Sequence, residues 1–295
     1  SSSQKLKFLS SGPLHILDVP GAGFALWAET AGANPIDACY SGSSSLDGDA
    51  VLSFMRALCA VSQEELTPPP HQGRPSVHML QRAIECAHHN LGRIRLVWSR
   101  LWSIVSQHLV SAACHHDADV AMYAVDALRQ LTAKLLAPRR RAELTNFARQ
   151  GEALRPFAAV LRHCDNPVVK DLAVSCVSQA VAAHSAELGG PGWRSAIEAL
   201  AVAAGDPAPE VVVRALGAMQ LVFNALYAEK NGHTCLTECA AAALEALGND
   251  AQSEELALGA VDLFQILAGR LSYMQVSLSL QQQQQQGGGK MGGDG

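Results

Sequence analysis

Four similar stretches decide the fold of this chain: Ala124-Val-Asp-Ala-Leu128, Ala173-Val-Ser-Cys-Val177, Ala215-Leu-Gly-Ala-Met219 and Ala260-Val-Asp-Leu-Phe264. Successive copies begin 49, 42 and 45 residues apart, and each opens with alanine. A small side chain at this point lets one helix lie close to the helix of the next layer, as stacked helical pairs require. The spacing and the alanines together predict a repeated pair of helices.

Helix-start signals precede each copy and support this prediction. They are Asp117 with Asp119, Asp165-Asn-Pro167, Asp206-Pro-Ala-Pro209 and Ser253-Glu-Glu255. Asp, Asn and Ser accept hydrogen bonds from the free N–H groups of a first helical turn, and proline fits that turn. Apolar periodicity predicts further helices near 141–163, 192–204 and 234–248, and upstream over 51–65, 76–90 and 93–113. Because a period of about 40 to 47 residues is typical of HEAT and armadillo repeats, we expect an all-α fold, an α-solenoid of such helical pairs.

Composition places low-complexity segments at both ends of the helical region. The chain has 295 residues, of which 48% are apolar, so it can bury a core. Residues 1–47 are rich in Ser, Gly and Pro, and Gln281–Gln286 followed by three glycines cannot bury a core. We therefore expect a mostly irregular linker over 1–47, a helical-repeat domain over 48–280 and a disordered tail over 281–295. The first residues lack the pattern of a signal peptide, and we expect a piece of a longer cytosolic protein.

Several function classes are disfavoured by the residues that the chain lacks. A net charge of −5 argues against a dedicated nucleic-acid-binding protein. The sequence contains no run of 18 consecutive apolar residues, so we expect no membrane span. There is no Gly-x-Ser-x-Gly, no His-Glu-x-x-His and no P-loop, so we expect no enzyme and no cofactor in this segment. The eight cysteines are scattered through apolar helical patterns, which indicates reduced thiols packed as small core residues.

Two clusters of polar residues are candidate binding sites. Cys86, His88 and His89 on one helix, with Cys114-His-His116 on the next, contain enough zinc ligands in number. Adjacent helical residues point about 100° apart, however, so these ligands converge poorly and we expect no metal site. Arg139-Arg-Arg141, with Lys134 before it, is able to contact anionic lipid, but a solvated loop between helices is the favoured interpretation.

The most distinctive segment runs from Asn90 to Trp102. On a helix, its apolar residues Ile94, Val97, Trp98, Leu101 and Trp102 share one arc, with arginines along both edges. This arc is either a buried face whose arginines lay their stems along its margins, or a partner surface, because Trp and Arg are frequent in interfaces. The candidate partner-binding residues are Asn90, Arg93, Arg95, Trp98, Arg100 and Trp102.

These residues and several other motifs resemble a known family. Phe54-Met-Arg-Ala-Leu-Cys-Ala-Val-Ser62 is similar to the start of the homology region that follows the catalytic domain in large ARF guanine nucleotide exchange factors, in the brefeldin A-inhibited, trans-Golgi branch. The resemblance continues in the Asn90–Trp102 segment, Val120–Leu131, Phe147, Leu154-Arg-Pro-Phe157, Cys176 with Ser178-Gln179, and Gly192-Trp193. Thr145–Gln150 is looser than the family form, and Pro191 replaces a usual small polar residue.

The resemblance implies a non-catalytic regulatory module. In the family, exchange activity resides in an upstream catalytic domain, of which these residues contain no part. The first downstream homology region is linked to autoinhibition and to sensing GTP-loaded ARF on Golgi membranes. The implied partners are an ARF-family GTPase, other domains of the same chain including the catalytic domain, and the cytoplasmic surface of trans-Golgi membranes; a homodimer is left open. The alternative is a purely structural helical-repeat spacer between other domains.

Overall fold

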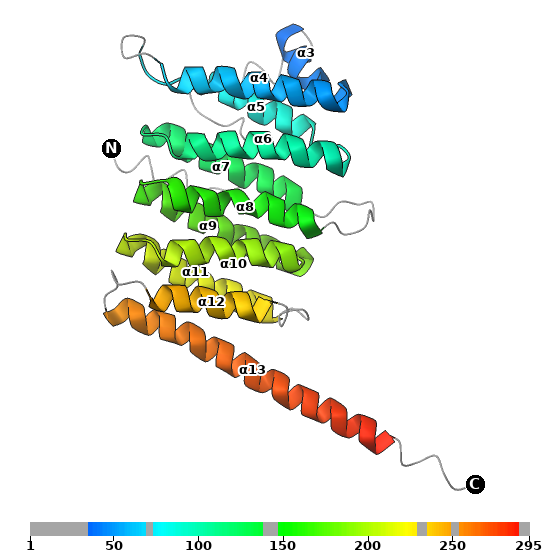
Figure 1. Ribbon diagram of the computed structural model, residues 1–295, viewed down its shortest axis with the longest axis vertical. Helices are drawn as coiled ribbons and strands as arrows, with labels where there is room; N and C mark the ends of the chain where they lie inside the picture. The colour runs from blue at the N-terminus through cyan, green and yellow to red at the C-terminus, as the bar shows by residue number, and fades with distance from the viewer. Residues whose placement is uncertain (1–34, 69–72, 138–146, 229–234, 249–253, 289–295) are drawn as a thin grey trace, which may run out of the picture. The chain divides into compact units, whose positions relative to one another are not determined.

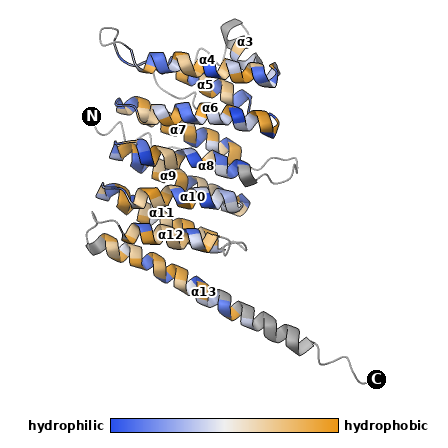
Figure 2. Ribbon diagram, in the orientation of Figure 1, coloured by the Kyte–Doolittle hydropathy of each residue, from blue (hydrophilic) through white to orange (hydrophobic). Residues whose placement is uncertain are grey.

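The computed structural model of the chain describes residues 35–68, 73–137, 147–228, 235–248 and 254–288. All regular secondary structure in these ranges is helical, which confirms the all-α prediction. The chain divides into two compact units, the first ending at Leu109 and the second beginning at Val110. Figure 2 shows that most helices carry both apolar and polar residues, as helices with one buried face do.

Unit 1 contains the first helices of the chain (Figure 1). They are α3 (Pro35–Gly42), the 3₁₀ turn η3 (Ser43–Ser45), α4 (Gly48–Leu66), α5 (His78–His89) and most of α6 (Arg95–Ala113). Helix α5 packs against α3, η3 and α4. Asp47 caps α4, because its carboxylate accepts hydrogen bonds from the N–H groups of Asp49 and Ala50 at 2.9 and 2.8 Å.

Unit 2 is built from two layers of helices. The layers alternate along the chain: α7 (Ala118–Leu136), α9 (Pro167–His184) and α11 (Pro209–Ala228) form one, and α8 (Phe147–His163), α10 (Gly190–Ala204) and α12 (Leu236–Leu247) form the other. A short 3₁₀ turn, η4 (Ser185–Glu187), precedes α10, and the final helix α13 (Glu254–Gly288) packs against α11 and α12. In each layer a helix contacts the next member of the same layer as well as its neighbour in sequence (Figure 1).

The four repeated stretches lie at equivalent points of this arrangement. They fall on α7, α9, α11 and α13, and their opening residues Ala124, Ala173, Ala215 and Ala260 are all fully buried. Three of the four predicted start signals act as expected: Asp117 caps α7, Asn166 caps α9, and Asp206 accepts a hydrogen bond from the N–H of Ala208 before α11. Ser253, in the fourth signal, lies outside the described residues. The helices predicted between the copies are α8, α10 and α12.

The structure differs from the expected linker and tail at their inner edges. Residues 35–45 are helical rather than irregular, and the Ser43 side chain is completely buried. Helix α13 continues through Gly288, beyond the expected start of the tail at residue 281, because glutamine is compatible with a helix. Residues 1–34 and 289–295 lie outside the described residues, so the limits of the helical region remain a prediction.

One described helix satisfies the length and composition of a membrane span. It is the stretch Pro209–Tyr227 of α11, of which 56% is buried within the fold. Val211, Met219 and Phe223 on this stretch are fully covered by neighbouring helices. The apolar composition of α11 is therefore accounted for by its place in the core of unit 2.

Candidate interaction surface

The Asn90–Trp102 segment divides into residues that hold the core together and residues that face solvent. Asn90 belongs to the first group, because its side chain is fully buried. Its amide nitrogen donates to the Ser43 hydroxyl at 2.8 Å and to the Cys86 carbonyl at 2.7 Å. Asn90 therefore ties the end of α5 to η3.

Arg93 completes this connection and is also structural. Its Nε donates to the Asn90 side-chain oxygen, and its Nη2 donates to the carbonyls of Ser43, Ser44 and Leu46 at 2.9, 3.2 and 2.7 Å. The guanidinium of Arg93 thus accounts for the hydrogen bonding of three backbone carbonyls between Ser43 and Leu46. We call Asn90, Arg93 and the Ser43–Leu46 backbone the Arg93 clamp.

Trp98 and Trp102 are core residues of unit 1. Their side chains are 1% and 3% exposed, and their rings stack with centroids 5.8 Å apart. The buried-face interpretation therefore describes both tryptophans. Ile94, in contrast, is 73% exposed, so it does not share the buried face of the two tryptophans, as the single predicted arc required. Helix α6 begins at Arg95, and the helical spacing that defined the arc does not extend back to Ile94.

The solvent-facing residues of the segment are apolar and cationic. Ile94 and the 64%-exposed Leu96 flank the exposed Arg95, and Arg100 is exposed one turn further along α6. Neither Arg95 nor Arg100 forms a hydrogen bond or ion pair with the described residues. Of the six candidate partner-binding residues, the structure therefore leaves Arg95 and Arg100 available at the surface.

Helices α4 and α6 run parallel and enclose a groove that contains Arg100. At one end, a Cβ on Gly48 would lie 3.1 Å from Val97; at the other, the Ser62 hydroxyl and His108 Nε2 are hydrogen-bonded at 2.8 Å. Between these contacts lies a groove of about 560 Å³, which we call the α4–α6 groove. Its lining residues are Asp49, Leu52, Ser53, Arg56, Arg100, Ser103 and Ile104.

Only Arg100 of this groove was among the sequence-predicted residues. Arg56, Ser53 and Ser103 were missed, because a sequence does not show which turn of α6 lies beside which turn of α4. The available signal was helical spacing: Asp49, Ser53 and Arg56 follow i, i+4, i+7 on α4, and Arg100, Ser103 and Ile104 follow i, i+3, i+4 on α6.

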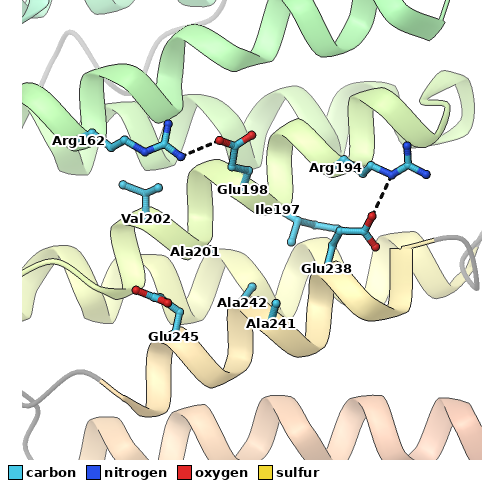
Figure 3. A pocket seen from close by; sticks show the side chains of 10 residues that line it. All are labelled: Arg162, Arg194, Ile197, Glu198, Ala201, Val202, Glu238, Ala241, Ala242 and Glu245. Atoms are coloured by element: carbon cyan, nitrogen blue, oxygen red, sulfur yellow. Dashed lines mark hydrogen bonds and ion pairs between the residues drawn. The ribbon is translucent and has the colours of Figure 1, made fainter.

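Unit 2 contains a second groove of about 380 Å³, which we call the α10–α12 groove (Figure 3). Its arginines are paired: Arg162 of α8 contacts Glu198 of α10 at 2.7 Å, and Arg194 of α10 contacts Glu238 of α12 at 2.9 Å. The floor consists of Ile197, Ala201, Val202, Ala241 and Ala242, and Glu245 stands at one side. Each ion pair joins one helix to the next helix of the same layer.

A buried ion pair in unit 2 was not anticipated from the sequence. Lys170 Nζ lies 2.5 Å from Asp206 Oδ2, and both side chains are almost completely buried. The other carboxylate oxygen of Asp206 accepts from the N–H of Ala208, so this residue both holds the turn that leads into α11 and neutralises the lysine of α9. The signal in the sequence was a lysine directly after two valines at the start of an apolar helix.

The Gly192-Trp193 motif has a packing role at the start of α10. Trp193 is buried and donates from Nε1 to the Leu188 carbonyl at 3.0 Å. A Cβ on Gly192 would lie 2.7 Å from Leu188 and 3.1 Å from the Gln150 side-chain oxygen. Gln150 in turn donates to the Glu187 carbonyl and accepts from the Gly189 N–H, both at 2.8 Å. Glutamine and glycine at these positions fix the entry into α10.

The described thiols and histidines are dispersed, and several of the buried thiols have a raised pKa. No group of three or more His, Cys, Asp or Glu residues there is placed to hold a metal ion. Burial raises the pKa of the Cys59, Cys176 and Cys239 thiols to about 12, so they are protonated and unreactive at neutral pH. Arg139–Arg141, considered for lipid contact, lie outside the described residues.

Comparison with known proteins identifies the family that part of the chain resembles. Residues 139–221, all within unit 2, match the family model described as Mon2/Sec7/BIG1-like, HDS. The chain contains an HDS homology region of this family. The match is to an HDS region, which is distinct from the domain that catalyses exchange.

Curated relatives extend the similarity beyond the matched region. The human brefeldin A-inhibited guanine nucleotide-exchange protein 1 is 38% identical over 177 residues, which are 60% of this chain and 9% of the relative. The Arabidopsis thaliana protein of the same name is 33% identical over 243 residues, which are 82% of this chain and 14% of the relative. The HDS-containing chain thus spans a small part of the length of these relatives.

Proposed function

We propose that this HDS-containing chain is a regulatory module of a large ARF guanine nucleotide exchange factor, acting in autoinhibition and in GTPase-dependent recruitment to Golgi membranes. The observation that carries the proposal is the similarity to brefeldin A-inhibited exchange proteins over 60 to 82% of the chain. The partners are an ARF-family GTPase, the catalytic domain of the same protein and the cytoplasmic surface of trans-Golgi membranes. The architecture that suits this role is a HEAT/armadillo-like solenoid, which offers extended surfaces rather than an enclosed active site.

The surface that we assign to GTPase binding is the exposed part of the Asn90–Trp102 segment. Ile94 and Leu96 supply exposed apolar area, and Arg95 and Arg100 supply charge. Arginine beside apolar side chains is a frequent composition of protein interfaces. The other four candidate residues stabilise the fold under this surface. Asn90 and Arg93 hold η3 in place, and Trp98 and Trp102 pack in the core.

Recruitment to liposomes tests the proposal. The 295-residue chain is incubated with liposomes that carry membrane-anchored ARF loaded with GTP or with GDP, and the bound protein is measured after sedimentation. We expect GTP-dependent recruitment that Arg95→Glu with Arg100→Glu abolishes. Arg155→Glu, at another exposed arginine, is the control. Unchanged recruitment of a folded Arg95→Glu, Arg100→Glu variant would show that the assigned surface is wrong.

A structural spacer is the second candidate function, and one observation favours it. Helix α13 presents Leu258, Leu271, Tyr273 and Val276 to solvent, all more than half exposed. Apolar side chains on the last described helix are expected where a further helical layer continues the stack. The spacer function predicts no recruitment to liposomes in either nucleotide state, so the same experiment separates the two.

A further inference from the structure

We infer that the α4–α6 groove of unit 1 binds an acidic peptide segment of a partner protein. The inference concerns the groove alone and does not depend on ARF binding or on membrane recruitment. It begins from two cations: Arg56 on α4 and Arg100 on α6 both line the groove, are exposed, and form no hydrogen bond or ion pair within the described residues.

The lining offers complementary chemistry for such a segment. The guanidinium groups of Arg56 and Arg100 bind carboxylates through two parallel N–H donors. The exposed hydroxyls of Ser53 and Ser103 add hydrogen-bonding groups beside them. Ile104, which is half-buried, offers apolar surface on which a nonpolar side chain of the segment packs, and the buried Leu52 lies at the base of the groove.

Asp49 gives the groove a direction. It lies in the first turn of α4, two helical turns before Arg56, so the Arg56 end of the groove is the one without a lining acid. At a rise of about 1.5 Å per residue, Asp49 and Arg56 are about 10 Å apart along the helix axis. A bound segment therefore places its acidic residues over the arginines and keeps further acidic residues away from Asp49.

Charge and shape favour a peptide over an anionic membrane as the occupant. Lipid surfaces are typically bound by clusters of about four to eight basic residues. The groove has two arginines and one aspartate, and the whole chain has a net charge of −5. Its walls are two parallel helices with an apolar floor, a form that suits a linear segment better than a flat membrane.

Peptide titration tests the inference directly. The probes are short fluorescent peptides in which two glutamates flank one leucine at different spacings, each with a matched peptide that carries glutamine in place of glutamate. We expect at least one acidic peptide to bind the 295-residue chain, and its glutamine counterpart to bind at least tenfold more weakly. Binding should weaken as salt increases.

Variants locate the peptide on the chain. Arg56→Gln with Arg100→Gln should weaken binding about tenfold or more, whereas Arg95→Gln with Arg155→Gln removes two exposed arginines outside the groove and should leave it unchanged. Circular dichroism confirms folding of each variant. Two results would overturn the inference: peptide binding that does not depend on Arg56 and Arg100, or binding of phosphatidylserine vesicles through these arginines without binding of any acidic peptide.

Discussion

The two units contain similar grooves between parallel helices, but they treat the arginines of those grooves differently. In the α10–α12 groove, Arg162 and Arg194 each form an ion pair with a glutamate of the next helix in the same layer. In the α4–α6 groove, Arg56 and Arg100 have no such partner among the described residues. A paired arginine has its charge largely compensated by the glutamate, whereas an unpaired one offers its full charge to an incoming anion. The comparison assigns a structural role to the first groove and a binding role to the second.

The same contrast holds for cations away from the grooves. Lys170 in unit 2 is buried against Asp206, and Arg214 of α11 contacts Asp171 of α9 at 2.7 Å. In unit 1, Arg93 is committed to the Arg93 clamp, while Arg56, Arg95 and Arg100 remain open to solvent. Four predictions test whether this division between structural and available cations is real.

The largest expected effect is in unit 2, at the buried ion pair. Lys170→Met removes one partner and leaves the Asp206 carboxylate buried without its counter-ion, which should lower the free energy of unfolding by about 3 to 5 kcal/mol. The control is Lys134→Met, the same substitution at an exposed lysine of α7, which should change it little. Urea denaturation followed by circular dichroism measures both. Equal losses in the two variants would show that the Lys170–Asp206 pair is not structural.

The next largest effect is in unit 1, at the Arg93 clamp. Arg93→Ala removes the donor to the carbonyls of Ser43, Ser44 and Leu46 and to the Asn90 side chain, and should lower the free energy of unfolding by about 2 to 3 kcal/mol. Arg95→Ala, two residues along the chain and exposed, should cost less than about 0.5 kcal/mol. If Arg95→Ala were as damaging as Arg93→Ala, our division of this segment into structural and available arginines would be wrong.

The helices of this fold could largely be predicted from the sequence, because they depend on local signals. The repeated alanines, the caps at Asp117 and Asn166 and the helices between the copies all appear where apolar periodicity and capping residues place them. The helical segment before α4 could not be predicted from the sequence, because residues far away in the sequence stabilise it. Ser43 is buried by Asn90 and Arg93, residues about 50 positions further along the chain.

The candidate surface was predicted only in part, for a related reason. Helical spacing correctly predicts that Trp98 and Trp102 lie together, but it also places Ile94 on the same arc. The reason is that the predicted helix begins at residue 93, whereas α6 begins at Arg95. The groove that Arg100 lines depends on the register between α4 and α6. That register is fixed by the Gly48–Val97 approach and the Ser62–His108 hydrogen bond, which no local pattern indicates.

His108 should make the stability of unit 1 depend on pH. Its ring is buried and hydrogen-bonded to Ser62, and burial lowers its pKa below the ordinary value. The unfolded chain then binds a proton at about pH 6.5, where the folded chain does not, so stability is present above that pH and falls as the pH decreases below it. His108→Gln should reduce the loss of stability between pH 7 and pH 5, measured by urea denaturation.

A matched histidine is needed because the chain has 11 of them. His89→Gln changes an exposed ring at the end of α5 and should leave the pH dependence close to that of the parent. If the free energy of unfolding of His108→Gln changes with pH as steeply as that of the parent and of His89→Gln, His108 is not held neutral in the folded chain. The Ser62–His108 hydrogen bond would then not be evidence for the parallel register of α4 and α6.

The smallest effect on stability comes from converting one groove into the other. Glu198→Gln with Glu238→Gln releases Arg162 and Arg194, which leaves the α10–α12 groove with two unpaired arginines and one acid, Glu245. That is the charge composition of the α4–α6 groove, with Arg56, Arg100 and Asp49. Because exposed ion pairs contribute about 0 to 1 kcal/mol each, the variant should remain folded with nearly unchanged stability.

If pairing is what separates the two grooves, the converted chain should bind a second equivalent of the acidic peptide, measured by isothermal titration calorimetry. Glu187→Gln with Glu210→Gln makes the same change in net charge at exposed positions outside the α10–α12 groove and should bind one equivalent. A gain in both variants would attribute peptide binding to net charge alone. If neither variant binds a second equivalent, unpaired arginines are insufficient, and the serines and the larger volume of the α4–α6 groove are also required, because the conversion does not transfer these features.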